Sequence, residues 1–405
     1  MKPPSPITQR HLVILLMFFS LAPFAFAQTS EAHILPFEFP SARLAALGGN
    51  HAALTDDYYT AFNNPAGFAA VPKKISFAEI SAEFNRMEFF WDLYFGTLTD
   101  ETIIKMVLLP SEANAVIGGP INFGMISNGW GWRVFSATRG NIYWNGITQR
   151  FMDAEYSEEV VGNLGYGFRL VATENATLDF GVMLKAFYRL AFLPERTITS
   201  FDDLVLAIEE IGDVFNFMRT QPYETQLGAG FDIGIRWTWR DSFSLGLTYK
   251  DPYTAAFITG FPDFDAYLAA ASDRTGYNTV APQLGIGLSW RIPSFKLHRY
   301  NTDLVFSADY NGLLKMFSEQ RNPLLYLSAG LELRLLEVFC LRVGVADCLP
   351  SGGIGLNFTY FQFDVAYGGK EMATEPGGNS TWFLSISFLF RLSFRNFQLD
   401  GITTF

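Results

Sequence analysis

Three long segments of the chain place apolar residues at every second position. Every odd position is apolar from Ala229 to Trp239, every even position is apolar from Trp382 to Phe394, and Leu325 to Leu335 repeats the pattern. Strand side chains point alternately to two faces, so this spacing predicts strands with one apolar face, whereas a helix would scatter the same residues around its circumference. Strands of a soluble β-sandwich run about 5 to 6 residues. Segments of 11 to 13 residues instead match the ~9 to 11 residues of a tilted strand that crosses a bilayer.

The composition is as apolar and aromatic as that of a membrane protein. The chain holds 41 Phe, 17 Tyr and 8 Trp, and only 17% of its residues are charged. Beyond the N-terminal leader, no segment stays apolar for the ~18 residues that a membrane-spanning helix needs. Dispersed apolar residues are typical of a transmembrane β-barrel, which turns an apolar face to lipid and a polar face to its interior. The net charge of −11 argues against a nucleic-acid partner.

Residues 1–27 have the features of a signal peptide. Lys2 and Arg10 supply positive charge, an apolar run extends from Leu12 to Ala22, and Ala25-Phe26-Ala27 fits the small-x-small cleavage rule. The alternative, a transmembrane anchor, needs ~20 apolar residues, and this run has only about 11. We therefore expect export of the protein and localisation in the cell outer membrane, with contact to outer-membrane lipid and insertion by the barrel-assembly machinery.

No linker divides the rest of the chain, so we expect one domain. Residues 28–74 would form an N-terminal periplasmic segment and plug, and residues 75–405 the transmembrane barrel. The expected fold class is all-β, an antiparallel transmembrane β-barrel of about 14 strands, within a range of roughly 12 to 16, with the plug inside the lumen. Candidate strands lie near 75–84, 88–95, 119–127, 129–138, 142–152, 158–171, 176–190, 223–239, 242–250, 280–291, 302–312, 324–336, 338–346, 352–359, 361–369 and 382–394.

The connections between the candidate strands alternate in length. Those at 191–222, 251–279 and 370–381 are long, whereas Trp239-Arg240-Asp241 and Leu336-Glu337 are tight, as expected of outer loops and periplasmic turns. The first long connection has a helical pattern, which Ser200 can cap. Its apolar positions, which form a possible ligand-capture loop, are Leu204, Ile208, Ile211, Phe215 and Met218. The second contains an Ala-rich helix signal at 262–272, and either helix could simply pack on the barrel rim.

Residues 41–71 differ from everything that follows because they are rich in Gly and Ala. Small residues let one backbone approach another, and Asn64-Pro65 imposes a break in the chain. We therefore predict a compact plug. The residues that we expect to shape it are Gly48, Gly49, Asp56, Asp57, Asn64, Pro65, Ala66 and Gly67.

Few residues of the sequence could take part in catalysis or metal binding. The expected mature chain has three histidines, His33, His51 and His298, and neither an HExxH nor a GxSxG motif, so we expect no enzyme, no cofactor and no metal site. Alternation places six charged residues on the lumen face of the strands, as structural ion pairs or as a selectivity lining. They are Asp232, Arg236, Asp309, Glu332, Arg334 and Arg391.

Short motifs at both ends resemble one known group of proteins. The N-terminal motifs are Ser41-Ala42-Arg43, Leu47-Gly48-Gly49, Asp56-Asp57 and Asn64-Pro65-Ala66-Gly67-Phe68. They resemble the signature of FadL-like and PorV-like outer-membrane proteins. A looser C-terminal pattern resembles a spirochaete branch of that group; it comprises Leu341-Arg342-Val343-Gly344, Gly352-Gly353-Ile354-Gly355-Leu356, Phe363-Asp364-Val365-Ala366-Tyr367 and Pro376-Gly377. The chain departs from the group at Tyr58 and Tyr59, where small residues are usual, and at His51, where Ala is usual.

The resemblance implies a 14-stranded barrel whose N-terminal segment folds inside as a hatch, with Asn64, Pro65 and Ala66 belonging to that hatch. It also implies two alternative functions. The first is an outer-membrane channel for passive uptake of hydrophobic small molecules such as long-chain fatty acids. The second is a non-conducting structural or secretion-associated barrel that binds a partner protein.

Overall fold

The structure is a computed structural model that describes most of the chain. The described residues are 37, 39–55, 58–71, 74–86, 111–127, 129–144, 152–192, 195–196, 219–292, 302–318, 320–336 and 338–394. Four predictions lie outside them: the leader over residues 1–27, the plug positions Asp56 and Asp57, the candidate strand near 88–95, and the ligand-capture positions from Leu204 to Met218.

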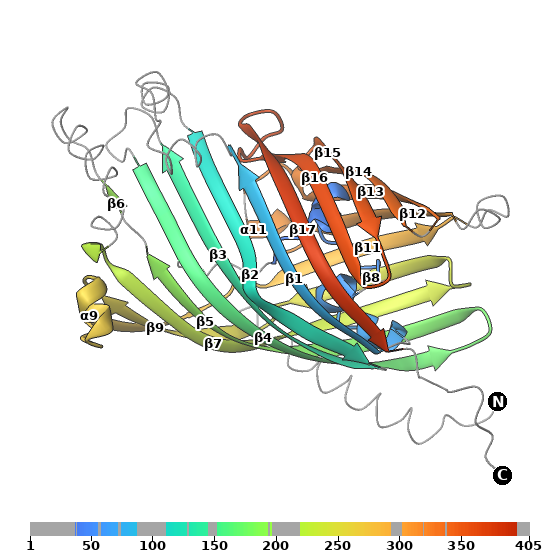
Figure 1. The fold of residues 1–405 in the computed structure, drawn as a ribbon, viewed down its shortest axis with the longest axis horizontal. Coiled ribbons are helices and arrows are strands. Elements are labelled where there is room, and N and C mark those ends of the chain that lie inside the picture. Colours follow the sequence, from blue (N-terminus) through green and yellow to red (C-terminus); the bar gives the residue numbers. More distant parts are fainter. Residues whose placement is uncertain are drawn as a thin grey trace, which may run out of the picture.

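The described residues form one antiparallel sheet that closes on itself (Figure 1). Its strands are β1 (Lys74–Asn85), β2 (Ser111–Ser127), β3 (Trp130–Trp144), β4 (Met152–Ala172), β5 (Ala176–Phe192), β6 (Glu195–Arg196), β7 (Tyr223–Trp239), β8 (Phe243–Lys250), β9 (Thr254–Phe261), β10 (Arg274–Thr279), β11 (Gln283–Arg291), β12 (Asp303–Asn311), β13 (Leu327–Leu335), β14 (Phe339–Ala346), β15 (Leu349–Asn357), β16 (Phe361–Glu371) and β17 (Ser380–Phe394). The barrel closes because β1 pairs with both β2 and β17.

Fourteen strands make up the barrel wall in the described part of the chain. The two short strands β8 and β9 pair with successive parts of β7, so they form one interrupted strand. In the same way β10 pairs with β9 and β11 pairs with β8. The two-residue β6 only extends the edge of β4. The predicted antiparallel barrel of about 14 strands is therefore confirmed.

Two details of the strand prediction were wrong. The candidate strand near 142–152 is wrong at both ends, because Ile142 to Trp144 end β3 and Met152 begins β4. The predicted long loop at 251–279 contains β9 and β10, which pair with each other, and β9 also pairs with β7. The helix expected within 262–272 is present as α9 (Phe264–Leu268), and the Asp263 carboxylate caps it by accepting a hydrogen bond from the Ala266 backbone N–H.

Side chains on the wall alternate between a polar interior and an apolar exterior. Asp232, Asp309 and Glu332 are buried on the lumen face, as predicted, whereas Val343 is 59% exposed and Ile354 is 62% exposed on the outer face. A closed sheet leaves no backbone group unpaired in lipid, and an apolar exterior around a polar interior is the pattern of outer-membrane barrels. The chain is a transmembrane β-barrel of the outer membrane.

The two ends and the two sides of the barrel differ. We call the end that carries the 193–222 and 262–273 connections the loop end, and the end with the turns near 173–175 and 240–242 the turn end. The wall is tall at β4, which has 21 residues, and low at β14, which has eight. Figure 1 shows the tall strands β2 to β5 rising toward the loop end beside the shorter strands β12 to β15.

The remaining helices are short. They are α2 (Ala42–Ala46), α3 (Tyr58–Asn63), α4 (Gly67–Ala70), α11 (Lys315–Ser318) and the 3-10 helix η2 (Pro323–Tyr326). In the part of the chain that the structure describes, no helix is long and apolar enough to cross a membrane.

The register of the low wall leads to a first prediction. Val343 lies near the middle of β14 on the outer face, next to the buried lumen residue Arg342. We expect Val343→Arg to lower the free energy of unfolding by about 2 to 4 kcal/mol, because it places a charge in the lipid core. Tyr360→Arg, at an exposed turn between β15 and β16, is the control and should cost about 1 kcal/mol or less near the interface. Urea unfolding in lipid vesicles measures both, and equal costs would contradict the assigned register.

Candidate functional site

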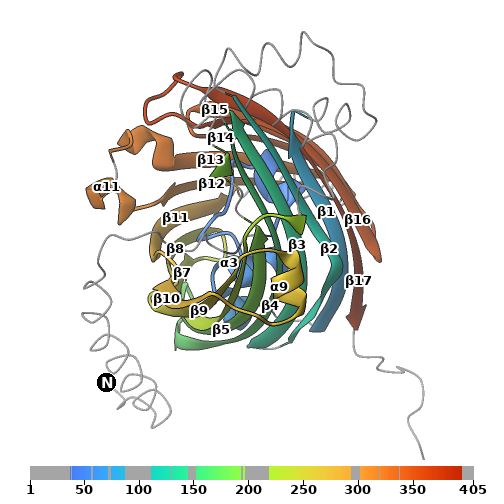
Figure 2. The same ribbon diagram turned by 90° about the vertical axis from the view of Figure 1, so that its left-hand side faces the viewer.

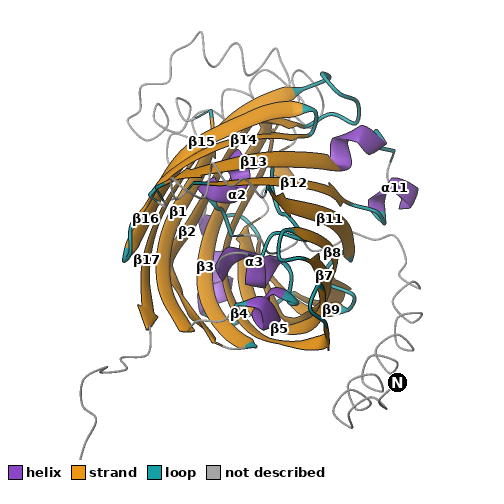
Figure 3. Cartoon of the chain, turned by 90° about the vertical axis from the view of Figure 1, so that its right-hand side faces the viewer, coloured by secondary structure: helices purple, strands orange, loops and turns teal. Residues whose placement is uncertain are grey.

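Residues 39–55 and 58–71, which we call the inner segment, lie inside the barrel. Figures 2 and 3 show the segment surrounded by strands, with α3 in the lumen. Helix α2 packs against β14 to β17 on one side, and α4 packs against β3 to β5 on the other. The segment therefore contacts opposite walls of the barrel.

Glycines of the barrel wall lie in close contact with the inner segment. A Cβ atom added at any of these glycines would come within 3.0 Å of the segment, which real Cβ atoms essentially never show. The contacts are Gly353 with Ala46, Gly330 and Gly344 with Leu47, Gly246 with Ala52, Gly234 with Asn64, Gly181 with Pro65, and Gly165 and Gly131 with Phe68. We call these eight residues the glycine track. Along the chain, the inner segment passes β15, β14 and β13, then β8, β7, β5, β4 and β3, so it follows the wall around the lumen.

Arg43 of α2 ties the inner segment to β13. Its Nε donates to Glu332 Oε2 at 2.9 Å and its second guanidinium nitrogen donates to Glu332 Oε1 at 3.1 Å. Glu332 also accepts from Arg334 at 2.6 Å and from Arg342 at 2.6 Å, and Arg342 donates to Asp364 at 2.5 Å. Arg43 and Glu332 are each only 1% exposed. Three guanidinium groups therefore surround one carboxylate in a buried network.

His51 forms a second tie, to β12. Its Nδ1 lies 2.5 Å from Asp309 Oδ2 and its Nε2 lies 2.9 Å from the Leu47 carbonyl oxygen. The other Asp309 oxygen accepts from the Ala52 backbone N–H at 2.7 Å. The ring therefore bridges the Asp309 carboxylate on β12 and the backbone of the inner segment. The residue that replaces the usual Ala thus anchors the segment to the wall.

The predicted plug residues occupy the bends of the inner segment. Gly48 and Gly49 end α2 with φ angles of +86° and +114°, which favour glycine. The Asn64 amide donates to the Ala52 carbonyl at 2.5 Å and to the Ile235 carbonyl at 3.3 Å, and its oxygen accepts from the Ala66 N–H at 3.0 Å. Asn64 therefore joins two parts of the segment to β7.

The remaining plug positions differ in what the structure describes. Pro65 lies against Gly181 and Gly67 begins α4, whereas Asp56 and Asp57 lie outside the described residues. That the segment closes the lumen stays a prediction.

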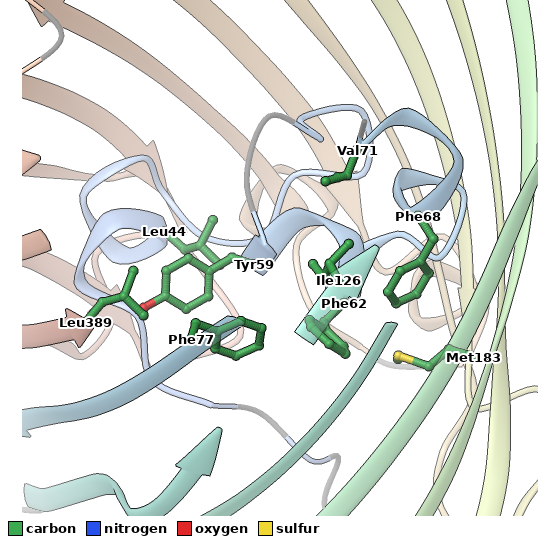
Figure 4. Close-up of a cluster of buried hydrophobic side chains, with 9 residues drawn as sticks. All are labelled: Leu44, Tyr59, Phe62, Phe68, Val71, Phe77, Ile126, Met183 and Leu389. Atoms are coloured by element: carbon green, nitrogen blue, oxygen red, sulfur yellow. The ribbon is translucent and has the colours of Figure 1, made fainter. Parts of the chain in front are cut away.

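A hydrophobic cluster lies between the inner segment and the barrel wall. Figure 4 shows its nine side chains, which come from both the segment and the wall. They are Leu44, Tyr59, Phe62, Phe68, Val71, Phe77, Ile126, Met183 and Leu389. Ring pairs such as Phe62 with Phe68, at 5.5 Å between centroids, pack edge to face.

Two cavities lie on the loop-end side of this cluster. The larger, of about 600 Å³, has the inner segment as its floor and the ends of the wall strands as its sides, and we call it the vestibule. The smaller, of about 70 Å³, lies deeper and is lined by aromatic residues including Phe37, Phe62 and Phe135. Six residues line both cavities: Phe39, Leu44, Asn50, Asn63, Lys250 and Gln283. These six form the boundary between the cavities.

The wall beside this boundary is irregular. The register of β2 shifts against β1 between Ala78 and Ser81, and against β3 between Gly118 and Asn122. The Phe39 ring occupies the space where a side chain of residue 118 would lie, and the Arg133 guanidinium stacks over the ring at 4.3 Å. The bulge thus interrupts the ladder of strand hydrogen bonds behind a single aromatic side chain.

The six lumen charges predicted from alternation behave as structural ion pairs in most cases. Asp232 pairs with Lys185 at 2.8 Å, and Arg236 lies 3.7 Å from Asp179. Arg391 instead donates to the Phe358 carbonyl at 2.7 Å in a turn, so it lies at the turn end and not deep in the lumen. Among the described residues, no group of three or more His, Cys, Asp or Glu could hold a metal ion.

Sequence reasoning missed several residues of the site. Phe39 carried no motif or spacing signal, and the Ser41-Ala42-Arg43 motif did not indicate which residue Arg43 contacts. The Gly118-Gly119-Pro120 run was a usable signal, because adjacent glycine and proline inside a strand indicate a bulge. His51 was noted only as a departure from the usual residue.

Comparisons with known proteins find structural neighbours alone. No family model matches the chain, and no curated protein matches it in sequence. The barrel is similar to the toluene transporter TodX of Pseudomonas putida, with 12% identity over 89% of this chain and 99% of that chain and a TM-score of 0.45. It is similar to the monoaromatic hydrocarbon channel CymD, with 12% identity, 90% and 99% coverage and a TM-score of 0.47. A Pseudomonas aeruginosa FadL homologue has 14% identity, 89% and 99% coverage and a TM-score of 0.39.

Proposed function

We propose that this barrel is a channel for passive uptake of hydrophobic small molecules across the outer membrane, without enzymatic activity. The observation that carries the proposal is the arrangement of the lumen. A vestibule of about 600 Å³ lies within the usual size range of ligand pockets, and Leu44, which lines the vestibule, also belongs to the hydrophobic cluster. Such a lumen suits a solute that leaves water for apolar contacts, because each buried methylene gains ~0.8 kcal/mol.

The proposed route leaves the lumen sideways, through the wall. The β2 bulge lies beside the cavity boundary, and Ile117, Ile121 and Phe123 are exposed on its outer face. A hydrophobic solute that displaces Phe39 from Gly118 would meet the interrupted ladder and then the lipid. The inner segment would supply the movable inner wall, since Gly48 and Gly49 can absorb rotation while Pro65 keeps its bend.

Long-chain fatty acids are the specific solutes that we propose. The test uses a host strain that lacks its own fatty-acid uptake and measures entry of a labelled long-chain fatty acid. We expect cells that express the full barrel to take up the labelled fatty acid faster than cells of the same host strain that do not express it. A variant that lacks residues 41–71 is compared after its assembly is verified by the shift in gel migration between unboiled and boiled samples. Higher ion conductance of the variant, with negligible uptake by both proteins, would contradict the uptake channel.

One observation favours the second candidate, a barrel that presents its loops to a partner protein. The connections at the loop end above the low wall are tied together. Glu371 accepts hydrogen bonds from the backbone of Ala373, Gly377 and Asn379 at 2.7 to 2.9 Å, and Asn322 reaches Glu375 at 2.8 Å. An ordered platform of this kind suits protein recognition. Mass spectrometry of the purified barrel separates the two candidates, since an uptake channel should carry bound lipid or fatty acid.

A further inference from the structure

The apolar outer face of the wall is much shorter on the low side of the barrel than on the tall side. On β7 the outward side chains are apolar from Trp239 at the turn end up to Leu227. On β14 they run only from Phe339 to Val345, where the strand approaches its turn at the loop end. With ~3.4 Å per residue and a strand tilt of about 40°, these runs rise about 31 Å and about 16 Å along the barrel axis. The apolar band of an outer-membrane barrel is about 25 Å tall, so the low wall alone is too short to form it.

Exposed aromatic residues mark one common level at the turn end of both walls. Trp130 begins β3, Trp239 ends β7, Trp290 is the next-to-last residue of β11 and Phe339 begins β14, and all four are exposed. Girdles of aromatic residues lie at the membrane interfaces of such barrels. Both walls therefore start at the same interface, and the difference in height falls at the loop end.

The connection between β12 and β13 continues the apolar surface of the low wall beyond its strands. We call residues 312–318 and 320–326 of this connection the rim, which contains α11 and η2. Figure 2 shows α11 standing out from the low wall beside β12 and β13. Leu324 of η2 is 55% exposed, and Met316 of α11 and Leu327, the first residue of β13, are also exposed. Exposed apolar side chains thus extend from the lipid-facing wall onto the rim.

Polar groups of the rim have partners inside the protein. The Arg321 guanidinium donates to Asp347 Oδ1 at 3.1 Å and to the Glu371 carbonyl oxygen at 2.8 Å. The Asn322 backbone N–H donates to the Thr374 carbonyl oxygen at 2.8 Å. Such internal partners are what lipid requires, because the hydrocarbon offers no water to a polar group.

The segment that bonds to the rim from above has a different surface. Residues 374–380 are exposed throughout and consist of Thr, Glu, Asn and Ser together with Pro and Gly. The bond between Asn322 and Thr374 joins this segment to the rim. On this side of the barrel, the change from apolar to polar surface therefore falls above the rim and not at the ends of the strands.

We propose that the rim is inserted in the outer leaflet of the membrane, where Met316, Leu324 and Leu327 contact lipid acyl chains. The rim then supplies the part of the apolar band that the short strands lack. Its continuity with the lipid-facing wall favours lipid over a partner protein as the occupant of this surface. On its inner side the rim lines the vestibule with Leu325 and Tyr326, so outer-leaflet lipid lies directly behind the wall of the vestibule. The inference does not depend on the solute of the channel.

Cys348 is a natural probe of the level of the rim. It is exposed at the turn between β14 and β15, its Sγ lies 3.8 Å from the Leu324 carbonyl oxygen, and the other cysteine, Cys340, is buried. A nitroxide spin label on Cys348 of the full barrel in phospholipid vesicles collides with oxygen, which concentrates among acyl chains, or with a water-soluble nickel chelate. Two reference labels are placed in a Cys348→Ser background. Val343→Cys reports the lipid-facing wall, and Asp265→Cys reports the exposed helix α9 above the tall wall.

We expect the ratio of oxygen to nickel collisions at Cys348 to be several-fold higher than at Asp265→Cys and close to that at Val343→Cys. Dioleoyl phosphatidylcholine should raise the ratio at Cys348 above its value in dimyristoyl phosphatidylcholine, because a thicker leaflet covers more of the rim. Heat modifiability on a gel verifies that each labelled protein is folded. A ratio at Cys348 equal to that at Asp265→Cys in both lipids would overturn the insertion. Few collisions with either reagent would overturn it too, since protein and not lipid would then cover the rim.

Discussion

Replacing Glu332 by glutamine is expected to destabilise the barrel by about 3 to 5 kcal/mol, the usual cost of removing one partner from a buried ion pair. The carboxylate holds three guanidinium groups, those of Arg43, Arg334 and Arg342. Without it, three positive charges face one remaining carboxylate of the network, Asp364. Like charges in a low-dielectric interior repel strongly and cannot regain their hydration. The loss also releases Arg43, so the inner segment loses its tie to β13.

The temperature at which the unboiled gel band converts to the boiled one measures this loss. The matched control is Asp265→Asn, which removes the carboxylate of the exposed Arg219–Asp265 pair, where both side chains are over 60% exposed. Surface pairs contribute about 1 kcal/mol or less, so the control should convert close to the wild-type temperature. The double variant Arg43→Met with Glu332→Gln removes one of the unpaired cations and should recover part of the loss. If Glu332→Gln and Asp265→Asn convert together, the buried network does not hold the segment.

The alternation of side chains made the barrel predictable from the sequence. β7 and β17 cross the membrane with one face in lipid, and the lipid-facing side chains must be apolar. Apolar residues therefore recur at every second position of both strands. In β9 the alternation is harder to recognise, although this strand pairs with β7 up to Tyr223, level with the end of β5. Its outward residues include both Phe257 and Thr259, and this mixture hides the alternation. The strand β9 was therefore missed because its outward face mixes apolar and polar side chains.

The interior was less predictable, since its contacts join residues far apart in the chain. Arg43 and Glu332 are separated by 289 positions, and His51 and Asp309 by 258. A single sequence shows that residues 41–71 are small and bent, which is why the bends at Gly48 and Asn64 could be predicted. It does not show which strand each bend meets. In the same way, alternation places Lys250 in the lumen, but only the fold shows that it lines both cavities.

A side chain placed on the glycine track should open the barrel without any change in the inner segment itself. Gly181 of β5 lies against the Pro65 backbone, and a Cβ atom there would come within 3.0 Å of it. Gly181→Leu therefore cannot coexist with the present position of Pro65. The cost of such overpacking is about 1 to 3 kcal/mol, and the barrel wall is held by ladders of hydrogen bonds along β4, β5 and β7. The inner segment, which is held by side-chain contacts and short helices, should yield first.

The expected result is an open pore, because displacement of Pro65 also moves Phe68 and the centre of the hydrophobic cluster. Wild-type protein in a planar bilayer should show little conductance, whereas Gly181→Leu should show stable open channels and make cells sensitive to large hydrophilic antibiotics. The matched control is Gly140→Leu on β3, where a Cβ atom would meet nothing within 4 Å, and it should behave as the wild type does. Gly140 lies between Arg139 and Asn141, which line the vestibule, so a side chain at Gly140 would point away from the lumen, and this variant controls for the added leucine alone. If Gly181→Leu folds and stays closed, the wall and not the segment has given way, and the inner segment is a fixed part of the barrel.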